Sequence, residues 1–211
     1  MLLRGLYAIT DNNLTPDHCL LDQVKQAILG GVKILQLRDK LRSDDELYPL
    51  AVALRELCRE HKVLFIMNDR LALALKVDAD GVHLGQHDLE FQEARKAIPD
   101  KLIGVSCYGD LERAEYYQDQ GADYVAFGAC FSSPTKPLAK QIPDTLLKEA
   151  KQRLQIPICA IGGITLGNAE QLTQHGVDML AVISDLWQSP EIIRQAKAFS
   201  RLFEESPMIS S

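Results

Sequence analysis

The stretch Gln36-Leu37-Arg38-Asp39-Lys40 places one amide and two cations at alternating positions, directly after the apolar pair Ile34-Leu35. In an extended backbone, alternate side chains point the same way. Gln36, Arg38 and Lys40 would therefore project together from the end of a buried strand. Because the chain as a whole is acidic, with a formal net charge of −6, two converging cations indicate an anion-binding pocket. The alternative for so short a stretch is a solvated charged turn.

Polar residues also follow most of the other short apolar runs of the chain. They include hydroxyl groups, glycines, cations and two carboxylates, which together favour the binding of anionic ligands. The candidates are Asn68-Asp69, Asp88, Ser106, Ser133, Thr135, Lys136, Gly162-Gly163 and Ser184.

Asp69 and Asp88 follow consecutive apolar runs, so they could approach each other at one rim of a sheet. Two carboxylates near cations indicate a Mg²⁺ site, because Mg²⁺ prefers oxygen ligands and commonly lies between carboxylates and substrate phosphates. The alternative is that both residues are helix N-caps, a position that Asp favours.

Gly162-Gly163 and Ser184 follow the last two apolar runs. In a barrel of eight strands, these places often bind a phosphate through backbone N–H groups. A tight turn that needs glycine is the alternative.

Eight apolar runs alternate with amphipathic segments along the chain, and we expect these runs to be strands. Eight strand–helix units in about 200 residues predict a single-domain (β/α)8 barrel, with an open doubly wound sheet as the second possibility. The predicted strands are Leu6–Thr10, Ile34–Arg38, Leu64–Met67, Gly81–Leu84, Leu102–Ser106, Tyr124–Phe127, Ile158–Ile161 and Met179–Ile183. Helix starts are predicted at Thr15-Pro16, at Ser43 with Glu46 as a capping box, and at Asn168.

Composition is that of an ordinary globular chain: 211 residues, 46% hydrophobic and 25% charged. We expect one domain over residues 1–205 and a frayed tail at 206–211. The five cysteines form no Cys-x-x-Cys pair, which fits reduced, mostly buried thiols in a cytoplasmic protein. No signal peptide, apolar run long enough for a bilayer, or basic stripe is apparent. We therefore expect small-molecule substrates and neither nucleic-acid nor membrane partners, and the sequence is compatible with a homo-oligomer.

Several sharper motifs are absent from the chain. There is no Walker-type phosphate loop and no Gly-x-Gly-x-x-Gly after the first strand. The segment from Gly104 to Tyr108 lacks the second glycine of a nucleophile elbow. His83 and His87 are four residues apart in a strand-to-loop segment, and this spacing does not favour a metal site.

Taken in order, these residues resemble the thiamine-phosphate synthase family, whose members are single-domain (β/α)8 barrels. The resemblance runs from the segment beginning at Tyr7 to Ser184. Its most specific pieces are Gln36-Leu37-Arg38-Asp39-Lys40, Asn68-Asp69, the segment Val82 to Asp88, Gly104-Val105-Ser106, Pro134-Thr135-Lys136 and Ala160-Ile161-Gly162-Gly163-Ile164.

The resemblance implies condensation of 4-amino-2-methyl-5-(diphosphooxymethyl)pyrimidine with a thiazole phosphate, which gives thiamine phosphate and pyrophosphate. Gln36, Arg38, Lys40 and Asn68 would then bind the pyrimidine diphosphate, with Lys136 and Ser106 at its pyrophosphate or reacting centre. Asp69 and Asp88 would hold Mg²⁺ as the cofactor. The thiazole phosphate would be lined by Ser133, Thr135, Gly163, Ile183 and Ser184.

The chain departs from the family pattern at Gly128-Ala129, where a Gly-Pro pair is usual, and at Ser133, where a Thr is usual. Asp185, directly after Ser184, would repel a bound phosphate unless it points away or caps a helix. The related thiazole tautomerases share the barrel but carry a catalytic His at the position of Ala129. A barrel that only senses a phosphate ligand is a non-enzymatic alternative, and it would not need Asp69 or Asp88.

Overall fold

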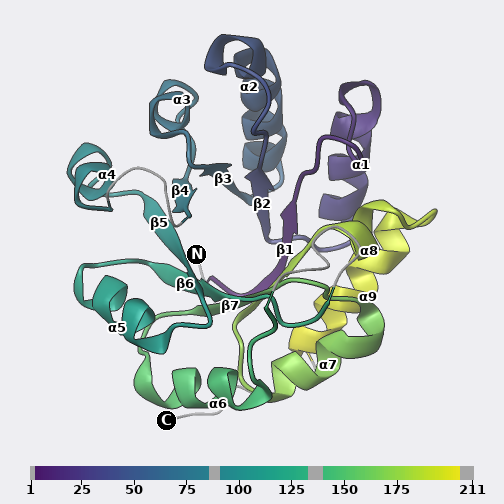
Figure 1. Cartoon of the computed structure of the whole chain (residues 1–211). Helices are drawn as coiled ribbons and strands as arrows, with labels where there is room; N and C mark the ends of the chain where they lie inside the picture. Colours follow the sequence, from purple (N-terminus) through teal and green to yellow (C-terminus); the bar gives the residue numbers. More distant parts are fainter. Residues whose placement is uncertain (1–2, 86–90, 133–139, 205–211) are drawn as a thin grey trace.

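Parallel strands β1 to β8 pair in sequence order and close into a barrel. The computed structural model describes residues 3–85, 91–132 and 140–204. Figure 1 shows the strands at the centre of the molecule and the helices in a ring around them. This arrangement confirms the predicted (β/α)8 barrel and excludes the open doubly wound sheet. The predicted tail at 206–211 lies outside the described residues, and the domain limits stay a prediction.

The strands are short, as is usual for a barrel: β1 (Gly5–Ile9), β2 (Ile34–Leu37), β3 (Leu64–Asn68), β4 (Gly81–Leu84), β5 (Leu102–Tyr108), β6 (Tyr124–Phe127), β7 (Ile158–Ile161) and β8 (Met179–Val182). The helices within the described ranges are α1 (Asp17–Leu29), α2 (Asp44–Glu60), α3 (Leu71–Lys76), α4 (Phe91–Ala97), α5 (Leu111–Asp119), α6 (Asp144–Arg153), α7 (Leu166–Gln174), α8 (Ser184–Trp187) and α9 (Ile192–Glu204). Every predicted strand is present, and the bounds differ by at most two residues at either end.

Two layers of buried side chains hold the barrel together. One layer fills the space between strands and helices and is mostly aliphatic. The other fills the barrel interior and includes Tyr7, Ile34, Ile66, Tyr124 and Met179. The alternation of side chains along each strand separates the two layers, because neighbouring residues face opposite sides of the sheet.

Local sequence signals explain where the helices begin, with two corrections. Ser43 caps α2, and Glu46 accepts a hydrogen bond from the Ser43 N–H at 2.8 Å, as the predicted capping box requires. Helix α1 begins one residue later than expected, because Pro16 has an extended backbone and Thr15 Oγ1 donates instead to the Asp11 carbonyl. Helix α7 is capped by Thr165 and not by Asn168, whose side chain accepts from the Thr165 N–H at 2.8 Å.

A repeated clamp joins strands at the amino-terminal end of the barrel. Three aspartates, each directly before an even-numbered strand, accept a hydrogen bond from a backbone N–H near the start of the preceding odd-numbered strand. These bonds run to Asp80 from Phe65 at 2.8 Å, to Asp123 from Ile103 at 2.7 Å and to Asp178 from Ile158 at 2.9 Å. Each aspartate also pairs with a cation of the helix before that odd strand: Arg55, Arg95 and Lys151 respectively.

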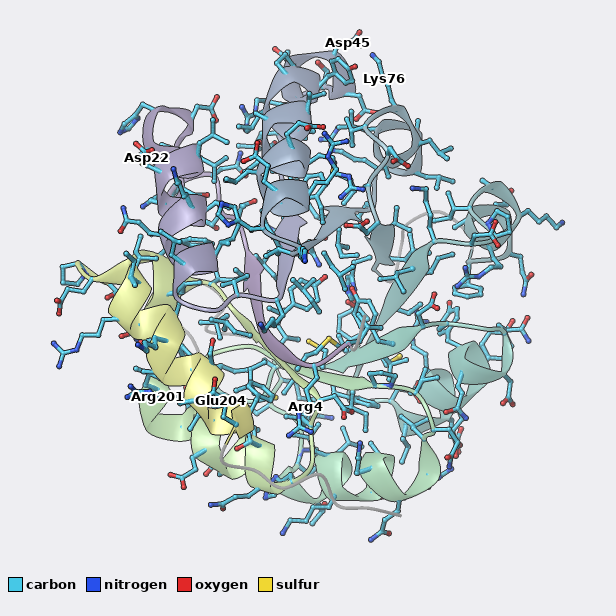
Figure 2. All side chains as sticks on the ribbon, turned by 180° about the vertical axis from the view of Figure 1, so that it is seen from behind. Arg4, Asp22, Asp45, Lys76, Arg201 and Glu204 are labelled. Atoms are coloured by element: carbon cyan, nitrogen blue, oxygen red, sulfur yellow. The ribbon has the colours of Figure 1, made fainter. Side chains whose placement is uncertain are left out.

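Helix α9 completes the barrel by packing against α1, α7 and β1. Arg4 donates to the Phe203 carbonyl at 3.2 Å, which ties the start of the chain to the end of α9. Figure 2 shows charged side chains on the outer surface, among them Asp45 of α2 and Lys76 of α3, which form an ion pair at 3.6 Å. None of the helices in the described ranges is long and apolar enough to cross a membrane.

Candidate active site

A cavity of about 1400 Å³ lies at the carboxyl ends of the strands. In (β/α)8 enzymes this is the catalytic face. Predicted site residues that line it are Gln36, Arg38, Lys40, Asn68, Asp69, Ser106 and Ile183. Gly163 and Ser184 are not among the lining residues, although their neighbours Gly162 and Ile183 are. Asp88, Ser133, Thr135 and Lys136 lie outside the described residues, so the roles predicted for them stay predictions.

The end of β2 carries the amide and the two cations into this cavity. Gln36 is buried at 2% exposure, whereas Arg38 is half-buried and Lys40 is exposed. The Arg38 N–H donates to Thr10 Oγ1 at 2.9 Å, which fixes the strand end against β1. Arg38 forms no ion pair with any residue that the structure describes. Its charge is therefore available to an anionic ligand.

Asp39 faces the other way and organises the loop between β2 and α2. It accepts hydrogen bonds from the N–H groups of Leu41 and Arg42, from Arg42 Nε and from Asn12. Burial alone would favour the neutral acid, but these hydrogen bonds outweigh it and lower the pKa of Asp39 to about 2. Asp39 is thus an ionised anchor of the loop that carries Lys40.

Asp69 presents a carboxylate to the cavity directly after β3. Its φ of +63° lies in the left-handed region, which costs a non-glycine residue about 1 kcal/mol. Asn68 Nδ2 donates to Asp69 Oδ2 at 2.6 Å, and Lys40 Nζ lies 3.4 Å from the same oxygen. An anionic oxygen donor at the cavity wall suits a hard divalent ion such as Mg²⁺. Within the described ranges, no cluster of three or more His, Cys, Asp or Glu side chains forms a metal site, and Asp88 lies outside them.

A row of five hydrogen-bonded side chains crosses the floor of the cavity, and we call it the polar row. Gln36 Nε2 donates to Tyr7 Oη at 2.7 Å, and Tyr7 Oη lies 2.8 Å from Tyr124 Oη. Tyr124 Oη lies 3.0 Å from His83 Nδ1, and His83 Nε2 lies 2.9 Å from Ser106 Oγ. Sequence reasoning missed Tyr7, Tyr124 and His83, although strand alternation was enough to point Tyr7 and Tyr124 inward.

Gly104 makes room for this row. A Cβ at Gly104 would lie 2.0 Å from Tyr124 Cζ and 2.4 Å from Tyr124 Oη. Gly104 also pairs in register with Tyr124 across β5 and β6. The Tyr124 ring stacks on His83 with their centroids 5.6 Å apart. The glycine of the Gly-Val-Ser segment therefore has a packing role two residues before Ser106.

Gly162 and Gly163 form the tight turn after β7. Their φ angles are +101° and +64°, and a Cβ at Gly163 would lie 2.5 Å from the Ser132 carbonyl oxygen. Glycine alone tolerates both the positive φ angles and the close approach of the Ser132 carbonyl oxygen. The turn interpretation therefore explains these residues without a ligand. Phosphate binding by Gly163 stays a prediction that the turn leaves open.

Asp185 does not direct its charge at the predicted phosphate position. Its Oδ2 accepts from the Leu166 N–H at 3.0 Å and from Gln195 Nε2 at 2.7 Å. Leu166 is the first residue of α7, so Asp185 satisfies the free N–H end of that helix. Two carboxylates that do line the cavity also have hydrogen-bond partners: Asp11 accepts from the Asn13 N–H and Asp110 from the Arg113 N–H.

A closed parallel barrel with cations, a carboxylate and a hydroxyl gathered at the carboxyl ends of its strands defines this chain as a (β/α)8-barrel enzyme. The family model described as Thiamine monophosphate synthase matches residues 6–186. The chain belongs to this family, which confirms the resemblance seen in the sequence.

Relatives of nearly equal length carry the same designation. A thiamine-phosphate synthase of Wolinella succinogenes is 48% identical over 209 residues, which cover 98% of this chain and 97% of the relative. A thiamine-phosphate synthase of Thioalkalivibrio sulfidiphilus is 44% identical over 96% of both chains. Among solved structures, the thiamine phosphate pyrophosphorylase from Pyrococcus furiosus is similar with a TM-score of 0.88 and 35% identity, over 96% of both chains.

Proposed function

We propose that this protein is a thiamine-phosphate synthase that joins 4-amino-2-methyl-5-(diphosphooxymethyl)pyrimidine to a thiazole phosphate. The bond between the pyrimidine methylene carbon and the diphosphate oxygen breaks, and a bond from that carbon to the thiazole nitrogen forms. Thiamine phosphate and pyrophosphate are the products. The observation that supports this best is the convergence of Gln36, Arg38, Lys40, Asp69 and Ser106 on one cavity, in a chain of this family.

The side chains of the cavity suit a displacement that needs no covalent enzyme intermediate. The thiazole nitrogen is already a neutral nucleophile, so no side chain has to deprotonate it. The aminopyrimidine can support positive charge on its methylene carbon, which favours a loose, dissociative step. Arg38 and Lys40 stabilise the negative charge that develops on the departing pyrophosphate, and the cavity holds both substrates together.

Asp69 and the predicted partner Asp88 are the residues that would hold Mg²⁺. When bound, the ion supplies further positive charge to the diphosphate. Ser133, Thr135, Lys136, Gly163 and Ser184 keep the thiazole-phosphate and pyrophosphate roles that the family resemblance gives them. A cytoplasmic location and the small-molecule character of both substrates accord with such a biosynthetic enzyme.

Thiazole tautomerase activity has less support in this cavity. Ala129 lines it where a tautomerase would carry its catalytic His, and a methyl group cannot transfer a proton. The direct experiment supplies purified protein with both substrates and Mg²⁺, and measures thiamine phosphate and pyrophosphate. Equal amounts of the two products would support the synthase. Thiazole isomerisation without any pyrophosphate would overturn it.

A pair of lysine variants tests the division of the site between the two substrates. Lys40→Ala should weaken the pyrimidine diphosphate about 10- to 100-fold, as expected for one charge-assisted contact, and spare the thiazole phosphate. Lys76→Ala is the matched control, because Lys76 is similarly exposed (53% against 56%) and also pairs with an aspartate, but on the outer surface. Isothermal titration calorimetry measures the affinity of each substrate for both variants. An equal loss of affinity for the two substrates in Lys40→Ala would contradict the assignment of Lys40 to the pyrimidine diphosphate.

A further inference from the structure

The polar row joins two ends of the cavity that would meet different parts of one substrate. Gln36 on β2 stands at one end and Ser106 on β5 at the other, with Tyr7, Tyr124 and His83 between them. The distances along the row run from 2.7 to 3.0 Å, so all four contacts are within hydrogen-bond range. Five strands supply these side chains, so the row is rigidly supported.

Little water can replace a missing partner along the row. Tyr124 is 0% exposed, Tyr7 1%, Gln36 2% and His83 8%. Burial raises the pKa values of Tyr7 and Tyr124 above their ordinary range, so both phenols keep their protons. Each phenol therefore has one proton to donate. A phenol that donates to one neighbour in the row must accept from the other.

These constraints allow only two uniform directions of donation. In the first, Gln36 Nε2 donates to Tyr7, Tyr7 to Tyr124, Tyr124 to His83 Nδ1 and His83 Nε2 to Ser106. The Ser106 hydroxyl proton is then free to point into the cavity. In the second, every donation is reversed, so the Ser106 proton is used on His83 and the Gln36 carbonyl accepts from Tyr7. A neutral His83 imidazole is compatible with either direction, because it donates from one ring nitrogen and accepts at the other.

The ligand at Ser106 selects between the two directions, and this step rests on the proposed function. The oxygens of an ionised diphosphate only accept hydrogen bonds, so a diphosphate at Ser106 requires the hydroxyl to donate to it. That requirement imposes the first direction on the whole row. At the far end, Gln36 Nε2 is then committed to Tyr7. Gln36 Oε1, which has no hydrogen-bond partner among the described residues, is left to accept from the heterocycle.

We propose that the polar row couples diphosphate binding at Ser106 to the orientation of the Gln36 amide, so that the site selects a pyrimidine whose exocyclic group donates N–H over one that carries a carbonyl. Tyr7 and Tyr124 are positioning residues in this scheme, because they act on the substrate only through Gln36. An amino group meets the Gln36 carbonyl as a donor. A ring carbonyl in the same place is a second acceptor beside the Gln36 carbonyl. Neither carbonyl oxygen then has a hydrogen-bond donor.

The test compares two ligands: the 4-aminopyrimidine diphosphate and its analogue with a carbonyl at position 4. Wild-type protein should bind the amino compound about 100-fold more tightly, because the carbonyl analogue leaves a buried acceptor without a donor. In Tyr124→Phe the row is cut, Tyr7 can donate to the Gln36 carbonyl, and the amide can present N–H to the cavity. The affinity ratio should fall at least about tenfold. Tyr117→Phe, half-buried in an aromatic group away from the cavity, should keep the wild-type ratio.

A second comparison needs no variant, so it stands even if Tyr124→Phe fails to fold. The alcohol forms of the two pyrimidines lack the diphosphate, and nothing then imposes a direction at Ser106. Wild-type protein should distinguish the two alcohols at least about tenfold less than the two diphosphates.

Three outcomes would overturn the inference. One is an equal ratio for alcohols and diphosphates. Another is a Tyr124→Phe variant that weakens both diphosphates equally and keeps the ratio, as a purely structural role predicts. In both, normal formation of thiamine phosphate by the wild type leaves the proposed function intact. Absence of that product would overturn the proposed function, and the inference with it.

Discussion

Replacing Gly104 by alanine should disrupt the barrel interior more than any exposed substitution. A Cβ there would lie 2.0 Å from Tyr124 Cζ, and ordinary contact begins near 3.4 Å. The ring would have to move by roughly 1.4 Å, although Tyr124 is fully buried. A shift of this size directly away from either partner of Tyr124 Oη, Tyr7 at 2.8 Å or His83 at 3.0 Å, takes that contact beyond hydrogen-bond range.

The cost of Gly104→Ala combines two effects. Overpacking a core costs about 1–3 kcal/mol, and one lost buried hydrogen bond adds about 1 kcal/mol. We therefore expect the free energy of unfolding to fall by about 2–4 kcal/mol. Urea unfolding followed by the fluorescence of Trp187, the single and buried tryptophan, measures it directly.

Two further variants test the predicted clash between a Cβ at position 104 and the Tyr124 ring. Gly167→Ala is the control, because a Cβ on that exposed residue of α7 would meet nothing closer than 3.8 Å, and it should be neutral or slightly stabilising. Tyr124→Leu removes the clashing ring, so adding Gly104→Ala to it should cost less than about 1 kcal/mol. A loss below about 1 kcal/mol for Gly104→Ala alone, or full additivity in the double variant, would refute the close approach.

Three other predictions follow from contacts of single carboxylates. Ionised Asp39, with its pKa lowered to about 2, stabilises the fold above about pH 4, and this stability is lost as the pH falls from 3.8 towards 2. Asp39→Asn should therefore lower the free energy of unfolding by about 2 kcal/mol at pH 7 and match the wild type near pH 2; an equal deficit at both pH values in urea titrations would contradict this. Asp185→Ala should lower the free energy of unfolding by about 1 kcal/mol, because α7 loses a cap, and should leave the thiazole-phosphate affinity within about twofold. A tenfold gain in that affinity by calorimetry would show instead that the carboxylate repels the phosphate. Asp69→Asn should raise the Mg²⁺ concentration needed for half-maximal turnover at least about tenfold, and an unchanged Mg²⁺ titration would remove Asp69 from the metal site.

The sequence was sufficient for features that depend on neighbours along the chain. Strand alternation placed Gln36, Arg38 and Lys40 on one side, and all three line the same cavity. The Ser43–Glu46 spacing predicted a capping box that forms. At α7, however, the predicted start at Asn168 was wrong, because Thr165 is the cap and Asn168 serves it as the third helical residue.

Contacts between distant strands were beyond such reasoning. Tyr7 and Tyr124 are 117 residues apart, and their contact depends on the register of the whole barrel. No local pattern predicts the place of His83 in the polar row, because its partners Tyr124 and Ser106 come from β6 and β5. The role of Gly104 likewise needs the β5–β6 register, which places it opposite Tyr124.

The aspartate clamps at the amino-terminal end also show which strand pairs side chains hold together at that end of the barrel. Clamps hold β3 to β4, β5 to β6 and β7 to β8, but the residue directly before β2 is Lys33, which forms no ion pair with any part of the chain that the structure describes. The β1–β2 pair is thus the one of the four odd–even pairs that lacks such a clamp among the described residues, and a side chain holds it at the carboxyl end instead, where Thr10 Oγ1 accepts from the Arg38 N–H. Because Arg38 and Lys40 follow β2 and line the cavity, the fastening of this pair lies beside the predicted anion pocket, whereas the other three odd–even pairs are fastened at the opposite end of the barrel.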